Sequence, residues 1–131
     1  MKNIKINVKT SKRCEFIDIT TAVKRVVVSE GFSDGLCSIF VPHTTAGITV
    51  NEAADPDVVR DILAHLEKSV PFEGNYTHAE GNSAAHIKAM ISGGSQAIPV
   101  EEGRLLLGTW QGIYFCEFDG PRNRSVIISL L

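Results

Sequence analysis

Two of the four histidines in this chain flank a Gly-Asn-Ser sequence that is typical of a helix start. His78 precedes that start, Asn82 lies within it, and His86 follows inside the expected helix. A helix N-terminus directs free backbone N–H groups and a partial positive charge at one point, where the two imidazoles could help to bind an anion or a metal ion. Capping or simple exposure would also explain each histidine, and their spacing matches no helical zinc motif.

A second polar cluster, Pro-His-Thr-Thr, interrupts a run of apolar residues. A neutral His43 could offer a ring nitrogen to a divalent metal, and the hydroxyl groups of Thr44 and Thr45 could bind phosphate or water. A strand junction with threonines that satisfy nearby backbone groups is the alternative. We therefore treat His43, His78 and His86 as candidate metal ligands and both threonines as candidate substrate-binding residues.

Asn51 and Glu52 end the next apolar segment, and Asp55 follows three residues later. A helix cap is a sufficient explanation for Asp55. Glu52 is either a solvated side chain or a carboxylate that faces a cleft, where it could complete a metal shell or move a proton.

The only tryptophan and a glutamine, Trp110 and Gln111, stand between two glycines. Core packing beside a bulge is one interpretation, and the other is a ring that stacks on a heteroaromatic ligand while the amide binds its edge. Arg122 and Arg124 follow a Gly-Pro turn, either as ordinary surface residues or as guanidinium groups that bind phosphate. The basic turn and the helix start at Asn82 could hold the same diphosphate.

Alternating polar and apolar residues, together with turn signals, predict the elements that position these groups. The first two strands are expected to form a hairpin. Three helices are expected, the second beginning with Asp55 as cap and Pro56 in its first turn. The expected strands cover residues 4–9, 14–19, 36–41, 47–50, 95–100, 104–109, 112–118 and 125–130, and the other two helices cover 22–30 and 83–91.

Links too short for parallel crossovers predict an α+β fold, with a largely antiparallel, β-sandwich-like sheet and about three flanking helices in a single domain of residues 1–131. The 13 basic and 15 acidic residues argue against a nucleic-acid-binding module. No apolar run approaches the ~18 residues of a membrane helix and no signal sequence is evident, so we expect a cytoplasmic protein without a membrane partner. Cys14, Cys37 and Cys116 are expected to be buried thiols in a reducing compartment.

Several ordered motifs resemble the YjbQ-like, secondary thiamine-phosphate synthase family. They are His-Thr-Thr-Ala-Gly-Ile-Thr-Val-Asn-Glu-Ala-Ala-Asp-Pro-Asp, Ala-His-Ile-Lys, Ile-Pro-Val and Gly-Arg-Leu-Leu-Leu-Gly-Thr-Trp-Gln-Gly-Ile-Tyr, which together span nearly the whole chain. The resemblance implies a compact α+β homotrimer and a histidine-containing site, with zinc or magnesium as the divalent metal. It also implies an activity that couples a hydroxymethylpyrimidine diphosphate to a thiazole phosphate with release of pyrophosphate.

The family motifs carry over to His43, Thr44, Thr45, Asn51, Glu52, His78, Asn82, His86, Trp110, Gln111 and Glu117. We assign catalytic roles to Glu52, His78, His86 and Gln111. Substrate binding is assigned to Thr44, Thr45, Asn51, Asn82, Trp110, Arg122 and Arg124. Many members read Gly-Asp-Asp where this chain has Gly-Asn-Ser, which weakens attraction for a hard cation and favours zinc on histidine nitrogen.

Two other functions are compatible with these residues. One is a metal-assisted phosphate-ester hydrolase, and the other is a non-catalytic trimeric module that binds a metal or a small molecule. For the enzyme hypotheses the expected partner is a small phosphorylated or heteroaromatic substrate.

Overall fold

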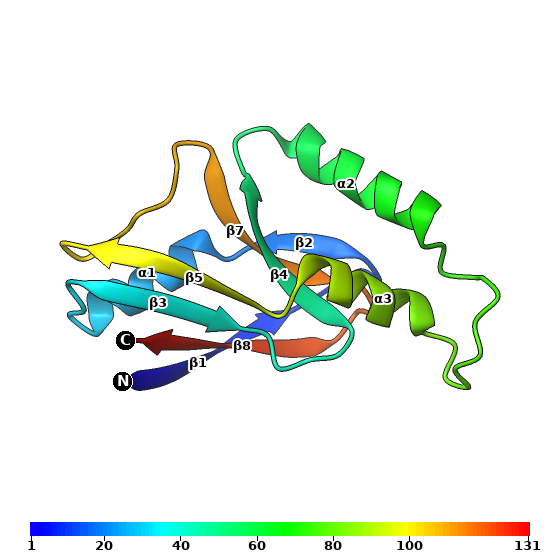
Figure 1. The fold of residues 1–131 in the computed structure, drawn as a ribbon, viewed down its shortest axis with the longest axis horizontal. Helices are drawn as coiled ribbons and strands as arrows, with labels where there is room; N and C mark the ends of the chain where they lie inside the picture. The colour runs from blue at the N-terminus through cyan, green and yellow to red at the C-terminus, as the bar shows by residue number, and fades with distance from the viewer.

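The computed structural model describes all 131 residues, which form eight strands and three helices (Figure 1). The strands are β1 (Lys2–Lys9), β2 (Glu15–Asp18), β3 (Gly35–Phe40), β4 (Ala46–Glu52), β5 (Ser95–Glu101), β6 (Arg104–Leu105), β7 (Gln111–Glu117) and β8 (Asn123–Leu130). The helices are α1 (Thr20–Ser29), α2 (Pro56–Ser69) and α3 (Ser83–Ser92). None of them combines the length and hydropathy needed to cross a bilayer.

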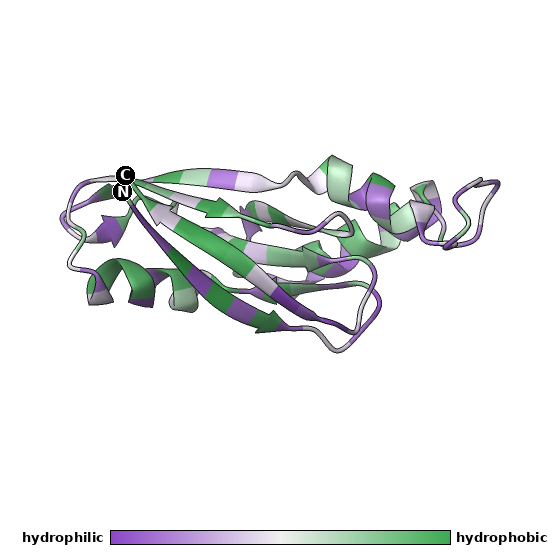
Figure 2. Cartoon of the chain, turned by 90° about the horizontal axis from the view of Figure 1, so that it is seen from below, coloured by the Kyte–Doolittle hydropathy of each residue, from purple (hydrophilic) through white to green (hydrophobic).

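The strands form two antiparallel sheets, one of five strands in the order β1-β8-β3-β5-β6 and one of three in the order β2-β7-β4. This confirms the α+β class predicted from the sequence. The two termini lie side by side because β1 pairs with β8 from Lys2 opposite Leu130 onwards. The loop between α2 and α3 lies at the opposite end of the molecule, where Figure 2 shows mainly polar residues.

The predicted hairpin of the first two strands is wrong. β1 pairs with β8 and β2 pairs with β7, so the two strands belong to different sheets. The intervening segment is bonded to the connection between β7 and β8: the Thr10 N–H donates to the Arg122 carbonyl at 3.0 Å, and the Gly120 N–H to the Arg13 carbonyl at 3.0 Å. Alternating apolar residues specify which face of a strand is buried but not which strand is its partner.

The main core of 18 buried residues includes side chains from both sheets and from α1. Strand β7 is buried on both faces because successive side chains point in opposite directions. Ile113 and Phe115 belong to the main core, whereas Tyr114, Cys116 and Phe118 form a smaller cluster with residues of α2 and α3. The three-stranded sheet is therefore a central layer.

Helix α3 packs closely on β4. A Cβ atom at Gly47 would collide with the Ser92 side chain and lie 2.8 Å from the Gly93 carbonyl oxygen, so only glycine allows this approach. The Ile48 N–H donates to that same Gly93 carbonyl at 3.0 Å. Ala84 and Ala85 are 1 % exposed at the other end of α3, which fixes the helix start beside the β7–β8 connection.

Helix α2 begins as predicted, with Pro56 in its first turn and the Asp55 carboxylate accepting from the Asp57 N–H at 2.9 Å. Its apolar stripe is only half-buried, and no residue of the helix is fully buried. A salt bridge of 2.9 Å joins Glu67 on α2 to the buried Lys88 on α3. Helix α2 is thus a peripheral element held against α3.

The three cysteines are free thiols. Cys37 and Cys116 are buried as predicted, whereas Cys14 is only half-buried. Burial raises the pKa of Cys37 to about 11 and also raises the pKa of Cys116. Both thiols remain protonated at neutral pH and are poor nucleophiles.

Candidate functional site

A polar cavity of about 420 Å³ lies where the start of α3, the β3–β4 connection and the β7–β8 connection meet. None of its lining residues is hydrophobic. The cavity brings together most of the polar residues singled out in the sequence, namely His43, Thr44, Thr45, His78, Asn82, His86, Arg122 and Arg124. The helix start and the basic turn therefore face one site.

The orientation of His43 is set by a backbone hydrogen bond. The Ser125 N–H donates to His43 Nε2 at 3.0 Å, so the Nε2 lone pair is already used. Burial, followed by the nearby Arg124 charge, lowers the pKa of His43. The ring is neutral at pH 7, carries its proton on Nδ1, and presents a hydrogen-bond donor.

His86 has the same tautomer as His43 but leaves the other nitrogen free. Its Nδ1 lies 3.1 Å from the Thr44 carbonyl oxygen, which can only accept, so the proton is on Nδ1. Nε2 of the neutral ring then keeps a free lone pair. This nitrogen can accept a proton or bind a cation.

His78 is exposed and lies beside His86, with ring centroids 5.5 Å apart and the planes at 78°. These two rings and His43 line one cavity, but the donors do not fit a resident metal ion. The His43 lone pair accepts from Ser125, and no group of three His, Cys, Asp or Glu side chains in the chain is arranged to hold a metal. The geometry therefore does not support the predicted three-histidine metal site.

Arg124 is hydrogen-bonded to the buried carboxylate of Glu117. Its Nη2 and Nε donate to the two oxygens of Glu117 at 2.6 and 2.8 Å, and Nη2 also donates to Thr45 Oγ1 at 2.8 Å. Burial raises the pKa of Glu117, but hydrogen bonds from Arg124, the Asp119 N–H and the Thr10 hydroxyl outweigh it, so the pKa lies below its usual value. Arg124 Nη1 has no partner in the chain, which leaves it for a ligand.

Arg122 is also paired. Its Nη2 donates to Asp119 Oδ2 at 3.1 Å, and its Nε donates to the Asp119 carbonyl at 2.8 Å. Asn82 Nδ2 donates to Asp119 Oδ2 and to Glu80 Oε2, both at 3.0 Å. The buried Asn82 Oδ1 has no partner. The carboxylates of Glu80 and Asp119, which also line the cavity, therefore weaken the attraction of the two arginines for an anion.

Glu80 and Asp119 were not singled out by sequence reasoning. Asp119 directly precedes the Gly-Pro turn, and Glu80 directly precedes the Gly-Asn-Ser helix start. The available signal was position, because Glu80 lies two residues before the helix start and Asp119 three residues before the first arginine of the basic turn.

Four predicted site residues, Asn51, Glu52, Trp110 and Gln111, do not line this cavity. Register explains why, because the antiparallel β4–β7 pair places Ala46 opposite Glu117 near the cavity and Glu52 opposite Gln111 at the far end. The seven residues of β7 put its ends about 20 Å apart.

At that far end, the side chains of Glu52 and Gln111 are held by hydrogen bonds to nearby backbone N–H groups. The Glu52 carboxylate accepts from the Ala54 N–H at 2.6 Å, and the Gln111 side-chain oxygen accepts from the Gly108 N–H at 2.8 Å. Trp110 is 64 % exposed. Within one chain these residues cannot act on a group bound between the histidines.

Known proteins resemble this chain over almost its full length. A protein-family model described as "UPF0047 protein YjbQ-like" matches residues 4–131. The UPF0047 protein YugU of Bacillus subtilis is 52 % identical over 96 % of both chains. UPF0047 protein MJ1081 of Methanocaldococcus jannaschii is 50 % identical over 97 % of this chain and 92 % of its own length.

Solved structures share the fold. A crystal structure of a YjbQ/UPF0047 family protein from Clostridium acetobutylicum has a TM-score of 0.95 and 58 % identity, and covers 98 % of this chain and 99 % of its own. A hypothetical protein from Aeropyrum pernix K1 has a TM-score of 0.95 and 40 % identity, and covers 100 % of this chain and 98 % of its own. With its two sheets, three helices and full-length match, the chain belongs to the YjbQ-like UPF0047 family.

Proposed function

We propose that the polar cavity is the active site of a transferase that acts on a small phosphorylated substrate. The observation that carries this proposal is the convergence of three hydrogen-bond donors on one cavity: His43 Nδ1, Arg124 Nη1 and the Arg122 guanidinium. Donors that are fixed before a substrate arrives stabilise negative charge that develops on a leaving phosphate or diphosphate. The all-polar lining suits such a group better than an aromatic ring.

The reaction we propose is of the thiamine-phosphate synthase type, which the family resemblance implies. The thiazole nitrogen forms a bond to the methylene carbon of hydroxymethylpyrimidine diphosphate. The carbon–oxygen bond to the diphosphate breaks, and pyrophosphate leaves with the electron pair. The three donors would stabilise the charge on the departing oxygens, and no proton has to be removed from the thiazole nitrogen.

A second function, phosphate-ester hydrolysis, is favoured by His86. Its free Nε2 lone pair could accept a proton from a water molecule as that water attacks the substrate. This hydrolase would not depend on a resident metal, because the donor set does not fit one. A general base of this kind typically contributes a factor of about 100 or more to the rate.

Product analysis distinguishes these functions. The protein is incubated with hydroxymethylpyrimidine diphosphate, with and without thiazole phosphate, and the products are identified by mass spectrometry. A coupled thiazolium product with equimolar pyrophosphate supports transfer, and free pyrimidine alcohol supports hydrolysis. Tight binding without either product would support the non-catalytic module.

Two matched histidine variants test whether His86 is the general base in hydrolysis. His86→Asn keeps a donor for the Thr44 carbonyl but removes the Nε2 base, so hydrolysis should fall about 100-fold while coupling changes little. His65→Asn is the control, since His65 is exposed on α2, does not line the polar cavity, and pairs its Nε2 with the Ser69 hydroxyl at 3.3 Å. Equal activity of both variants would exclude a base at His86.

A further inference from the structure

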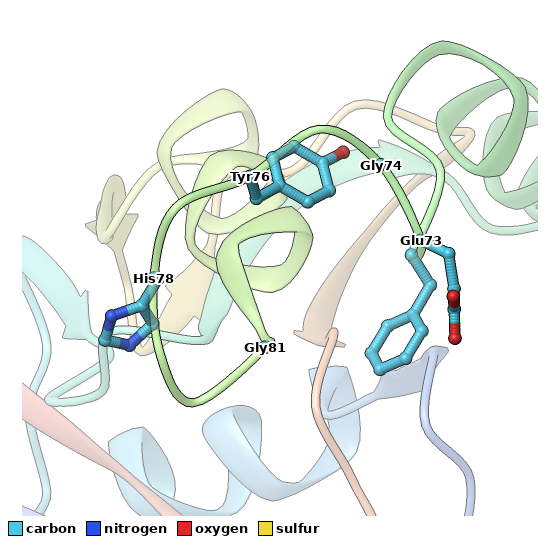
Figure 3. Close-up of a pocket in the computed structure, with 6 residues that line it drawn as sticks. Glu73, Gly74, Tyr76, His78 and Gly81 are labelled. Carbon is cyan, nitrogen blue, oxygen red and sulfur yellow. The ribbon is translucent and has the colours of Figure 1, made fainter.

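A second cavity, of about 220 Å³, adjoins the polar cavity. His78 lines both cavities, so the two adjoin at that side chain. The loop between α2 and α3 forms the second cavity, and Figure 3 shows Tyr76, His78 and Gly81 along its course towards the start of α3. Unlike the polar cavity, this loop cavity presents two aromatic rings, Phe72 and Tyr76.

Neighbouring groups hold both rings in place. The guanidinium carbon of Arg13 lies 3.7 Å from the centroid of the Phe72 ring. The Tyr76 hydroxyl donates to the Pro71 carbonyl at 2.7 Å, and the Tyr76 ring lies against Gly74, where a Cβ atom would be 2.8 Å from the ring edge. Because these contacts exist without a ligand, little side-chain freedom is lost on binding.

The two cavities complement the two halves of one ligand. The polar cavity provides donors for phosphate oxygens and is lined by no hydrophobic residue, whereas the loop cavity presents the rings of Phe72 and Tyr76 beside the His78 imidazole. Volumes of about 420 and 220 Å³ together fall within the roughly 300–1,000 Å³ usual for small-molecule sites. Trp110 and Gln111, the ring platform predicted from the sequence, lie at the far end of β7.

We propose that the loop cavity is the subsite for the heteroaromatic ring of a phosphorylated substrate whose phosphate groups occupy the polar cavity. The ring lies against Phe72 and Tyr76, with His78 at the junction between ring and phosphate. This inference rests on the proposed function, because it assumes a phosphorylated ligand in the polar cavity. It assigns the ring to a part of the chain that the sequence motifs did not indicate.

Calorimetric titration with two probes tests the subsite. Hydroxymethylpyrimidine diphosphate carries the ring, and inorganic pyrophosphate lacks it. Tyr76→Ala should weaken binding of the pyrimidine diphosphate about tenfold, as expected for the loss of a stacking surface, and should leave pyrophosphate affinity unchanged. Gly74→Ala is a second variant that displaces the Tyr76 ring without removing it, and it should act in the same direction.

Trp110→Ala tests the rival ring platform that the sequence suggested, and the loop subsite predicts that it changes the ratio of the two affinities less than Tyr76→Ala does. If Trp110→Ala weakens the pyrimidine diphosphate and Tyr76→Ala does not, the ring lies elsewhere and the inference is wrong. Equal affinity of the unmodified protein for both probes would also overturn the ring subsite while leaving the phosphate site intact. Binding of neither probe would overturn the proposed function itself.

Discussion

The backbone N–H of Ser125 donates a hydrogen bond to His43 Nε2 at 3.0 Å. The first residues of β8 thereby determine the tautomer of a side chain in the β3–β4 connection. A histidine whose acceptor nitrogen is used in this way presents only an N–H to the cavity. His43 is therefore suited to bind an oxyanion and unsuited to act as a base or a metal ligand.

We predict that His43 stays neutral at a pH where an ordinary histidine is half protonated. Nitrogen NMR of the ring should show a protonated Nδ1 and an unprotonated Nε2, and its pKa should lie below about 6.5. A spectrum with the proton on Nε2 at neutral pH would contradict the assignment.

The same shift predicts a pH dependence of stability. Because the folded state lowers the pKa of His43, the unfolded chain binds more protons, and stability falls as pH decreases below about 6.5. His43→Gln keeps an acceptor for Ser125 but does not titrate, so denaturation midpoints should fall less between pH 6.5 and 5. The exposed His65→Gln should leave this dependence unchanged.

Glu117→Gln should destabilise the protein by about 3–5 kcal/mol, because it leaves the charge of the buried Arg124 unpaired. The free energy of unfolding is measured with denaturant at one protein concentration. Glu102→Gln is the control, as its ion pair with Arg104 is long, at 3.6 Å, and both side chains are 79 % exposed. Glu102→Gln should lower the free energy of unfolding by less than about 1 kcal/mol. An equal loss in both variants would contradict a larger contribution from the buried pair.

Local signals in the sequence predicted the helices well. An aspartate cap followed by proline located the start of α2, and the helix predicted at residues 83–91 is α3, which ends one residue later, at Ser92. The strand predicted at residues 104–109 is reduced to Arg104–Leu105, because the following segment turns, with Gly108 bonded to the Gln111 side chain. Strand partners were not predictable, because they depend on contacts between distant segments.

The same distinction holds for the site. His43, His78 and His86 each stand in a polar interruption of an apolar pattern, and all three line the cavity. Glu52 and Gln111 also stand at such interruptions, but strand register places them at the other end of the β4–β7 pair. Residue type can nominate a functional group, whereas only the antiparallel register shows which groups meet.

We propose that the chain assembles as a homotrimer, as the family resemblance implies. Large apolar side chains such as Phe40, Met90, Ile91 and Trp110 are exposed on the isolated chain, and contact with other copies would bury apolar surface. Light scattering at micromolar concentration should report about three times the 14.2 kDa mass of one chain. A mass of 14.2 kDa under those conditions would contradict the trimer.

Removal of metal ions should not abolish ligand binding. Among the three histidines of the polar cavity, only His78 and His86 offer a free imidazole lone pair, since His43 accepts from Ser125. Protein dialysed against EDTA should therefore bind pyrophosphate as tightly as untreated protein. Stoichiometric zinc that is lost in His43→Gln would instead show that the His43 ring turns to bind metal.

The pairing of Arg122 with Asp119 predicts a gain of affinity when the carboxylate is removed. Asp119→Asn keeps an oxygen that can accept from Asn82 and Arg122 but removes a negative charge from the cavity wall. Pyrophosphate should then bind about fivefold tighter, with a steeper dependence on salt concentration.

A second Arg–Asp pair provides the control for this experiment. Arg60 and Asp57 have the same three-residue spacing, with a contact of 2.7 Å, but lie on the exposed face of α2. Asp57→Asn changes the net charge by the same amount and should leave pyrophosphate affinity unchanged, because screening weakens its effect at that site. A gain of pyrophosphate affinity in Asp119→Asn alone would place the anion beside Arg122. Equal gains in both variants would show that the effect comes only from the change in net charge.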